Sequence, residues 1–235
     1  MCGRFAQIIK HNQLKKLMDE LEIRNKDEQI EINYNVAPSQ PVGAVIYKGQ
    51  DRFLTFFRWG LIPAWSKEPS SKFSLINVRA ETILEKPTFK NALLRRRCLI
   101  PATGFYEWRK SDKQPFFIYR KGKDNASENT SAFDELLFFA GITEYWNGAD
   151  GSYIQSCAII TTAANATILP LHDRMPVILT PELTESWLRE DYRDPAGLKA
   201  LLKPCPDEWI DIYPVSKMVS STDNNSEECL KPISI

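Results

Sequence analysis

Apolar residues recur at helical spacing in several segments of the chain. Between His11 and Ile23, the side chains of Leu14, Leu17 and Leu21 fall on one side of a helix with 3.6 residues per turn, which predicts an amphipathic helix. A second helix is predicted to open at Thr180, a suitable N-cap, because a proline follows in the first turn. Helices are therefore expected over residues 11–23, 88–97, 163–169, 181–189 and 195–202.

Short apolar or alternating runs bounded by Gly, Pro, Asn and Asp predict many strands. These runs are 3–7, 42–47, 52–58, 76–82, 98–101, 104–108, 114–120, 136–142, 153–162 and 209–215. Segment 33–41 is rich in Asn and Pro and predicts an irregular loop. Many short strands, few helices and no repeat or clear linker predict one α+β domain over residues 1–235, built on curved antiparallel sheet.

Two segments are polar and low in apolar residues. Residues 121–131 lie between two aromatic-rich strands and are expected to form a mobile loop. The tail from about residue 220 is also polar, and we expect it to be loosely held.

Composition narrows the class of protein. Hydrophobic content of 43% and charged content of 26% are ordinary for a globular domain, and no apolar run is long enough to span a membrane. The N-terminus has no signal-peptide pattern, and the odd, widely spread cysteines favour a reducing cytoplasm over a disulfide framework. Only two histidines are present and no Cys pair has CxxC spacing, so we expect no metal site. Thirty basic and thirty acidic residues give no net charge, which argues against a uniformly basic nucleic-acid coat.

The first residues offer unusual chemistry. Removal of Met1 makes Cys2 the N-terminus and places a free amine and a thiol on adjacent carbons, with reference pKa values of about 8 and about 8.5. Such an aminothiol can be an N-terminal nucleophile that cleaves acyl bonds. It can also condense with an aldehyde to an imine that the thiol closes into a thiazolidine ring. By position alone, Cys2 is equally well a small residue after the initiator.

Three further polar positions stand out. Asn77, Arg79 and Glu81 share one face of a predicted strand, which suggests the wall of a polar pocket. Glu107 lies among Phe and Trp, where a raised pKa suits a general acid or base, although an outward-facing carboxylate fits the pattern too. His172 stands before Asp173 and Arg174 and is either structural or catalytic.

These stretches together resemble the SOS response-associated peptidase (SRAP) family, which includes bacterial and human abasic-site shielding proteins. The similarity spans nearly the whole chain, in the order seen in that family. The matching segments are Met1-Cys2-Gly3-Arg4-Phe5, Tyr34-Asn35-Val36-Ala37-Pro38, Trp59-Gly60-Leu61-Ile62-Pro63-Ala64-Trp65, Asn77-Val78-Arg79-Ala80-Glu81-Thr82, Gly104-Phe105-Tyr106-Glu107-Trp108 and His172-Asp173-Arg174-Met175-Pro176.

The resemblance implies a barrel-like sheet with peripheral helices, and a monomer that binds single-stranded DNA at abasic sites without a cofactor, metal or membrane. It implies covalent attachment through Cys2 after loss of Met1, with Asn77 positioning the reactants, Glu107 shuttling protons and His172 assisting. The DNA-contacting residues that it implies are Arg4, Pro38, Trp65, Arg79, Trp108, Thr161 and Arg174.

The sequence departs from the family pattern in two places. Ser66 follows Trp65 where relatives carry a second tryptophan, and Ser220 and Ser221 stand where relatives have an Asn after a Val. Two other functions stay open at this point. Some glutamine amidotransferases also begin Met-Cys-Gly, so an N-terminal-nucleophile amidohydrolase or peptidase is one, and a non-catalytic single-strand-binding module is the other.

Overall fold

The computed structural model describes residues 2–69, 75–122 and 130–235. Its helices are α1 (His11–Glu20), α2 (Pro87–Arg95), α3 (Ala132–Glu135), α4 (Pro181–Leu188) and α5 (Pro195–Ala200), with 3-10 turns at Asp207–Trp209, Lys217–Ser220 and Glu227–Leu230. Its strands are β1 (Phe5–Gln7), β2 (Asn33–Val36), β3 (Pro41–Lys48), β4 (Asp51–Trp59), β5 (Asn77–Arg79), β6 (Arg97–Ala102), β7 (Gly104–Trp108), β8 (Pro115–Arg120), β9 (Leu137–Asn147), β10 (Tyr153–Ala163), β11 (Arg174–Pro176) and β12 (Ile210–Pro214).

Strands β10, β4, β3, β6 and β9 close into a barrel. Each pairs with the next in that order, and β9 pairs back onto β10. The β10–β4 pairing is parallel and the other pairings in the ring are antiparallel. A closed ring leaves none of these strands with a free edge along its paired length. The expectation of an α+β domain on barrel-like sheet is confirmed.

The long strand β10 changes partners along its length. Its first half pairs with β9, and its second half leaves the barrel to pair with β5 and β11. In this way β10 connects the barrel to the short strands that carry Asn77 and Arg174.

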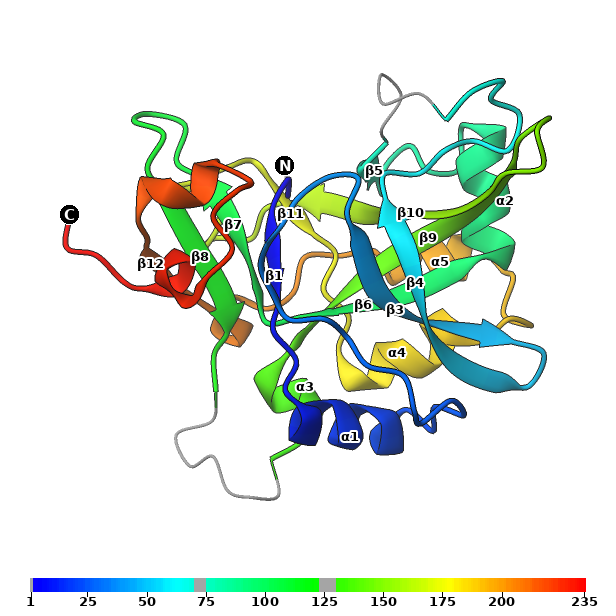
Figure 1. Ribbon diagram of the computed structural model, residues 1–235, viewed down its shortest axis with the longest axis horizontal. Coiled ribbons are helices and arrows are strands. Elements are labelled where there is room, and N and C mark those ends of the chain that lie inside the picture. Colours follow the sequence, from blue (N-terminus) through cyan, green and yellow to red (C-terminus); the bar gives the residue numbers. More distant parts are fainter. Residues whose placement is uncertain (1, 70–74, 123–129) are drawn as a thin grey trace.

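A second, five-stranded sheet runs in the order β12-β8-β7-β1-β2 and is antiparallel throughout. Figure 1 shows it beside the barrel, with the N-terminal end between the two sheets. Phe5 in β1 is fully buried and packs edge-on against Trp59 and Phe139 of the barrel strands, with ring centroids 5.0 and 5.9 Å away. These aromatic contacts fix the start of the chain at one end of the barrel.

The helices cover the outside of the barrel. Leu14 and Leu17 of α1 and Trp187 of α4 belong to one buried cluster with outward-facing strand residues such as Leu99. Figure 1 shows α1 and α4 along one side of the barrel and α2 at its end. The helical periodicity of the sequence therefore places these segments as predicted, with no end shifted by more than three residues.

Two local predictions are wrong. Residues 163–169 form the end of β10 and a turn instead of a helix. The Asn165 side chain accepts a hydrogen bond from the Ile168 backbone amide and donates to the carbonyl of Cys205. The segment predicted as an irregular loop contains strand β2, which pairs with β1. Its residue Asn35 is buried yet fully used by hydrogen bonds, so a polar sequence is tolerated there.

The C-terminal segment is anchored instead of loosely held. The Asn35 amide donates to the carbonyls of Val219, Ser221 and Asn224. Cys229 is fully buried, and Val215 bridges to Pro232. Composition alone missed these contacts because their partners lie about 190 residues earlier in the chain. Of the polar loop predicted over 121–131, residues 123–129 lie outside the described residues.

Candidate active site at the N-terminus

Strand pairing brings the start of the chain to residues that are distant in sequence. β1 lies between β2 and β7, and the Arg4 carbonyl accepts a hydrogen bond from the Tyr106 amide. Cys2, just before β1, is fully buried. The Asn77 side-chain amide donates to the Cys2 carbonyl at 2.7 Å, and this position of Asn77 is set by its pairing with Ile159 of β10. The predicted removal of Met1 concerns a residue outside the described part of the chain.

Asn77 has a spare acceptor at this point. Its Oδ1 atom is buried and has no hydrogen-bond partner among the described residues. A buried carbonyl oxygen without a hydrogen-bond partner costs free energy. Such an oxygen can therefore accept a hydrogen bond from a bound ligand or from a newly formed amine.

Glu107 on β7 faces inward, with 4% of its surface exposed. Its charge helps raise the pKa of the Cys2 thiol and opposes the fall in the pKa of His172. The carboxylate is thus an electrostatic neighbour of both groups. The structure brings Cys2, Asn77, Glu107 and His172 together from four separate elements.

The Cys2 thiol does not readily lose its proton in this environment. Burial and then the charge of Glu107 raise its pKa to about 12, so the sulfur is protonated near neutral pH. A reaction at this sulfur therefore needs a base to take the proton.

His172 precedes β11 and is mostly buried. Its Nδ1 atom lies 3.0 Å from the Arg174 backbone amide nitrogen and 2.9 Å from Oδ1 of Asp173. Burial lowers the pKa of His172, while Glu107 and Asp173 act in the opposite direction. Asp173 is in turn bound by Lys110 at 2.9 Å. These contacts hold the imidazole ring in place, and its burial favours the neutral form.

The guanidinium of Arg174 is held by the carboxylate of Glu81. Both oxygens of Glu81 contact its guanidinium, at 2.6 and 2.9 Å. The Nη2 atom also donates to the carbonyl and the hydroxyl of Thr161. Thr161 is fully buried, so in this structure it acts on Arg174 and not at the surface. Direct contact of Thr161 with DNA stays a prediction.

Three other predicted DNA contacts are exposed. Pro38 and Arg79 reach solvent, and Arg79 forms no ion pair within the described ranges. Trp65 is 74% exposed, with its indole nitrogen donating to the Thr88 hydroxyl at 3.0 Å. The next residue, Ser66, uses its carbonyl to accept from the Trp146 indole. Trp65 is thus an exposed aromatic ring that its hydrogen bond to Thr88 orients, with no second tryptophan beside it in the sequence.

Arg4 and Trp108 are engaged with the C-terminal segment. Arg4 donates to the Asn35 side chain and to the Val219 carbonyl, each at 2.8 Å. The Trp108 indole donates to the hydroxyl of Ser220 at 3.1 Å. Their contacts with nucleic acid stay predictions, and in this structure both residues fasten the tail beside the site.

Two residues of the site were not identified as such from the sequence. Glu81 was noticed only as a member of a polar strand face, and its partner Arg174 lies 93 residues later. Lys110 carried no signal, because it lies in a polar turn whose contact with Asp173 exists only in the folded chain.

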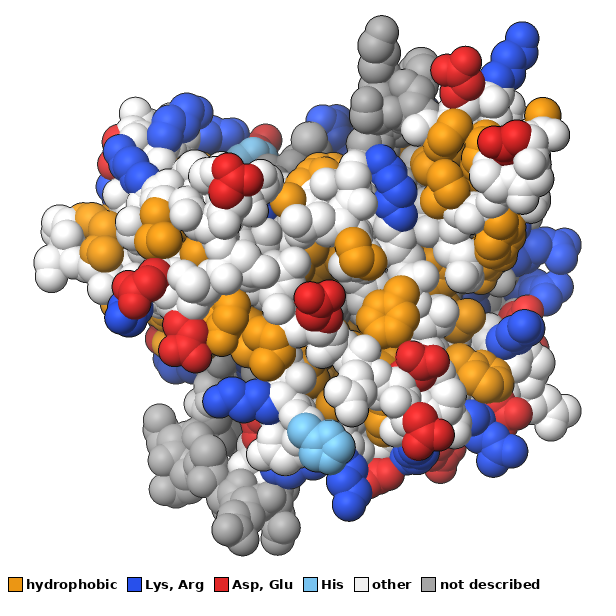
Figure 2. Space-filling model, in the orientation of Figure 1, with side chains coloured by type: hydrophobic (Ala, Val, Ile, Leu, Met, Phe, Trp, Pro, Cys, Tyr) orange, Lys and Arg blue, Asp and Glu red, His pale blue; other side chains and the backbone are white. Residues whose placement is uncertain are grey.

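The molecular surface is of mixed charge on one face. Figure 2 shows Lys and Arg side chains interspersed with Asp and Glu on the face it presents. No cluster of three or more His, Cys, Asp or Glu side chains that could hold a metal ion occurs within residues 2–69, 75–122 and 130–235. None of the helices described there is long and apolar enough to cross a membrane.

Solved structures of other proteins share this fold. A crystal structure of a protein from Bacteroides thetaiotaomicron superimposes with a TM-score of 0.81 at 25% identity, covering 99% of this chain and all of that one. A second structure, from Bordetella bronchiseptica, has a TM-score of 0.72 at 21% identity and supports the fold alone.

Residues 1–222 match the SOS response associated peptidase (SRAP) family, and the chain belongs to that family. The abasic site processing protein YoqW of Bacillus subtilis is 38% identical over 98% of this chain and 99% of its own length. The abasic site processing protein HMCES of Mus musculus is 37% identical, over 77% of this chain and 57% of that protein.

Proposed function

We propose that this protein captures abasic sites in single-stranded DNA as a covalent thiazolidine on Cys2, once Met1 has been removed. The observation that carries the proposal is the convergence of Cys2, Asn77, Glu107 and His172 described above. The names of the relatives, abasic site processing proteins, support the same substrate.

The proposed reaction balances as a condensation. The Cys2 amine adds to the C1′ aldehyde of the open sugar, and the carbinolamine loses water to give an imine. The thiol sulfur then adds to the imine carbon, and its proton ends on the ring nitrogen. One aldehyde and one aminothiol thus give one thiazolidine and one water, with no oxidant, metal or cofactor.

Each polar residue has a step in this scheme. Glu107 delivers a proton to the departing hydroxyl and takes one from the sulfur, whose pKa of about 12 makes a base necessary. His172 assists by hydrogen bonding of its imidazole to the sugar oxygen. The unused Asn77 oxygen accepts a hydrogen bond from the liberated amine and holds it in place.

DNA binding in this proposal is independent of sequence. Arg79 and Arg174 contact phosphates, with Arg4 at the edge of the site, while Trp65 and Trp108 give faces on which any base can stack. Pro38 and Thr161 complete the DNA-facing wall, Thr161 through the arginine that it holds. Because the net charge is zero, binding depends on these local cations and not on bulk charge.

The consequence is protection of the strand in the DNA damage response. An imine at an abasic sugar promotes loss of the 3′ phosphate by β-elimination, and closure of the thiazolidine suppresses that break. All five cysteines are free, which supports a reducing cytoplasm as the place of action. We propose a monomer, since the site is assembled from one chain.

Peptidase action is confined in this proposal to removal of Met1. Cysteine nucleophiles that turn over acyl substrates have depressed thiol pKa values, and that of Cys2 is raised. This opposes a general amidohydrolase or peptidase. A non-catalytic single-strand-binding module leaves the buried Cys2, Glu107 and Asn77 without a role.

The test is adduct formation on a denaturing gel. Mature protein is incubated with a single-stranded oligonucleotide that carries one abasic site, and a band of lower mobility is expected. The matched DNA control carries a tetrahydrofuran at that position, which keeps the gap but lacks the aldehyde and should give no band. Absence of a band with the true abasic site, from protein whose mass confirms loss of Met1, rejects the proposal.

A further inference from the structure

A cavity lies at the end of the barrel that is farther from Cys2. The cavity has a volume of about 540 Å³, within the range typical of small-molecule sites, and lies where ligands commonly enter small barrels. Its floor includes Ile46 of β3, Tyr145 of β9 and Gln155 of β10. From Gln155 to Thr161, which touches Arg174, β10 runs six residues, or about 20 Å at the usual rise of a strand.

Part of the lining belongs to the inner face of the barrel. Tyr145 is opposite Gln155 in the β9–β10 ladder, and Ile46 is opposite Cys98 in the β3–β6 ladder. Alternation along the strands puts these side chains on the same face as Cys98 and Gly141, which pack in the interior. The cavity therefore joins the mouth of the barrel to the neighbouring segments that carry Glu28, Arg95 and Glu190.

One wall is an exposed aromatic face held rigidly from behind. The ring of Tyr153 is 56% exposed and lies nearly parallel to that of Tyr145, with 8° between the planes and 6.1 Å between the centroids. Tyr145 is itself packed against Phe57, at 6.3 Å. An exposed aromatic ring fixed in this way offers a ready platform for another flat ring.

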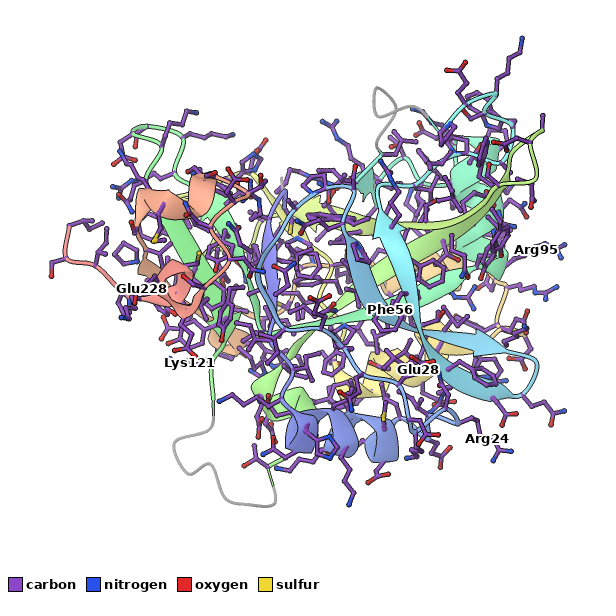
Figure 3. All side chains as sticks on the ribbon, viewed as in Figure 1. Arg24, Glu28, Phe56, Arg95, Lys121 and Glu228 are labelled. Carbon is purple, nitrogen blue, oxygen red and sulfur yellow. The ribbon has the colours of Figure 1, made fainter. Side chains whose placement is uncertain are left out.

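The rim carries cations that the fold does not use. Arg95, at the end of α2, and Lys48, at the end of β3, are both exposed and form no ion pair within the described residues. Figure 3 shows Arg95 reaching outward at the edge of the molecule. By contrast, Arg96 is bound to Glu144 at 2.8 Å, and Arg97 donates to backbone carbonyls around α4. Arg95 and Lys48 are thus the cations available to a ligand.

Polar groups complete the lining. The side chain of Gln155 makes no hydrogen bond within the described chain, so its amide can both donate and accept. Glu28 and Glu190 also line the cavity and can accept from hydroxyl or amino groups. An aromatic ring can stack on a base, a free cation can bind a phosphate, and an unused amide can hydrogen-bond the edge of a base.

We propose that this barrel mouth binds a nucleotide, with its base stacked on Tyr153 and its phosphate held by Arg95 and Lys48. The ligand is either a free nucleotide or one residue of a single strand, since both present the same groups. Gln155 contacts the edge of the base. The site is separate from the reaction at Cys2, and its existence does not depend on the function proposed above.

The test uses the full chain with Cys2→Ala, so that no covalent chemistry interferes. Backbone amide NMR shifts are followed while dAMP, and separately an undamaged oligothymidylate, is added up to the order of 1 mM, where weak binding is visible. We expect shifts at Thr55, Thr143 and Gln155 with at least one probe. Shifts with dAMP assign a free nucleotide as ligand, and shifts with the oligonucleotide alone assign a strand.

Variants identify the groups responsible. Tyr153→Ser should weaken binding at the mouth about fivefold or more, while Tyr153→Phe, which keeps the ring, should retain it. Arg95→Gln should also weaken it, whereas Lys90→Gln, which removes one charge from the same helix outside the cavity, should not.

Two results overturn the proposal. One is the absence of shifts at the mouth with either probe. The other is binding there that is indifferent to both Tyr153→Ser and Arg95→Gln. Because Tyr153 and Arg95 are exposed, neither substitution removes a core contact, and the amide spectrum of each variant reports directly whether the fold is kept.

Discussion

In the proposed complex Arg174 contacts a DNA phosphate. Glu81 occupies the same guanidinium, so removal of the Glu81 charge should tighten DNA binding. Both Glu81 oxygens contact Arg174, and this pairing lowers the pKa of Glu81, so the carboxylate is charged at neutral pH. Half of the Glu81 side chain is exposed, against 14% for Arg174. Glu81→Gln keeps the shape of the side chain and releases the charge of Arg174.

The magnitude follows from the exposure of the pair. A half-exposed ion pair is worth about 0–1 kcal/mol, so its release should tighten binding of undamaged single-stranded DNA by up to about fivefold. If Arg174 then neutralises one more phosphate, the slope of log K against log salt should steepen by about 0.7. The slope separates a new phosphate contact from a general gain in positive charge.

The assay is fluorescence anisotropy of a labelled oligonucleotide across a salt series, with Cys2→Ala as the common background. Glu85→Gln removes the same charge from an exposed position nearby without releasing an arginine, and should leave the slope unchanged. Weaker binding by Glu81→Gln, or equal slopes for Glu81→Gln and Glu85→Gln, would refute the view of Glu81 as a stand-in for phosphate.

Further predictions concern stability. Gly141→Ala places a Cβ 2.6 Å from the Cys98 sulfur and should lower the free energy of unfolding in urea by about 1–3 kcal/mol. Adding Cys98→Ala should recover part of this loss. Gly122→Ala, which has open space around it, should change the free energy of unfolding little. Asn35→Ala leaves tail carbonyls without a donor and should cost about 1–3 kcal/mol, with faster hydrogen exchange over 217–225. The pKa of His172 is lowered by folding, so the unfolded chain binds its proton first as pH falls. Stability should therefore drop between about pH 7 and about pH 5 by more in the wild type than in His172→Gln.

The sequence predicted the elements whose signal is local. The spacing of Leu14, Leu17 and Leu21 gave α1, and the Thr180-Pro181 pair marked the start of α4. Alternating apolar runs gave most of the strands. These predictions succeeded because periodicity reflects which face of an element is buried, whatever it packs against.

The closure of the barrel was harder to predict from residues alone. It depends on β10 pairing in parallel with β4, about 100 residues earlier in the chain. The strand at 33–36 was missed because Asn33 and Asn35 favour turns locally, while Asn35 finds its partners near the far end of the sequence. Long-range hydrogen bonds of this kind override local preference.

The sequence singled out the residues of the candidate site but not the contacts that hold them, and their roles stay predictions. Cys2, Asn77, Glu107 and His172 were singled out as residues that could do chemistry, and the fold brings them together. The commitment of Arg174 to Glu81 and of Arg4 to the tail could not be read from the sequence, since each contact joins segments that only folding makes adjacent.

The central claim is that the amine and thiol of Cys2 both bond to the sugar, and mass spectrometry of the digested adduct tests it most directly. The wild type, mixed with abasic single-stranded DNA and no reductant, should give an amino-terminal peptide carrying the sugar at Cys2, with the thiol no longer open to alkylation. Cys2→Ser should give such a peptide only after borohydride treatment, because its imine is not trapped by sulfur. A stable adduct of Cys2→Ser without reductant, or a sugar attached at another residue of the wild type, would contradict the account.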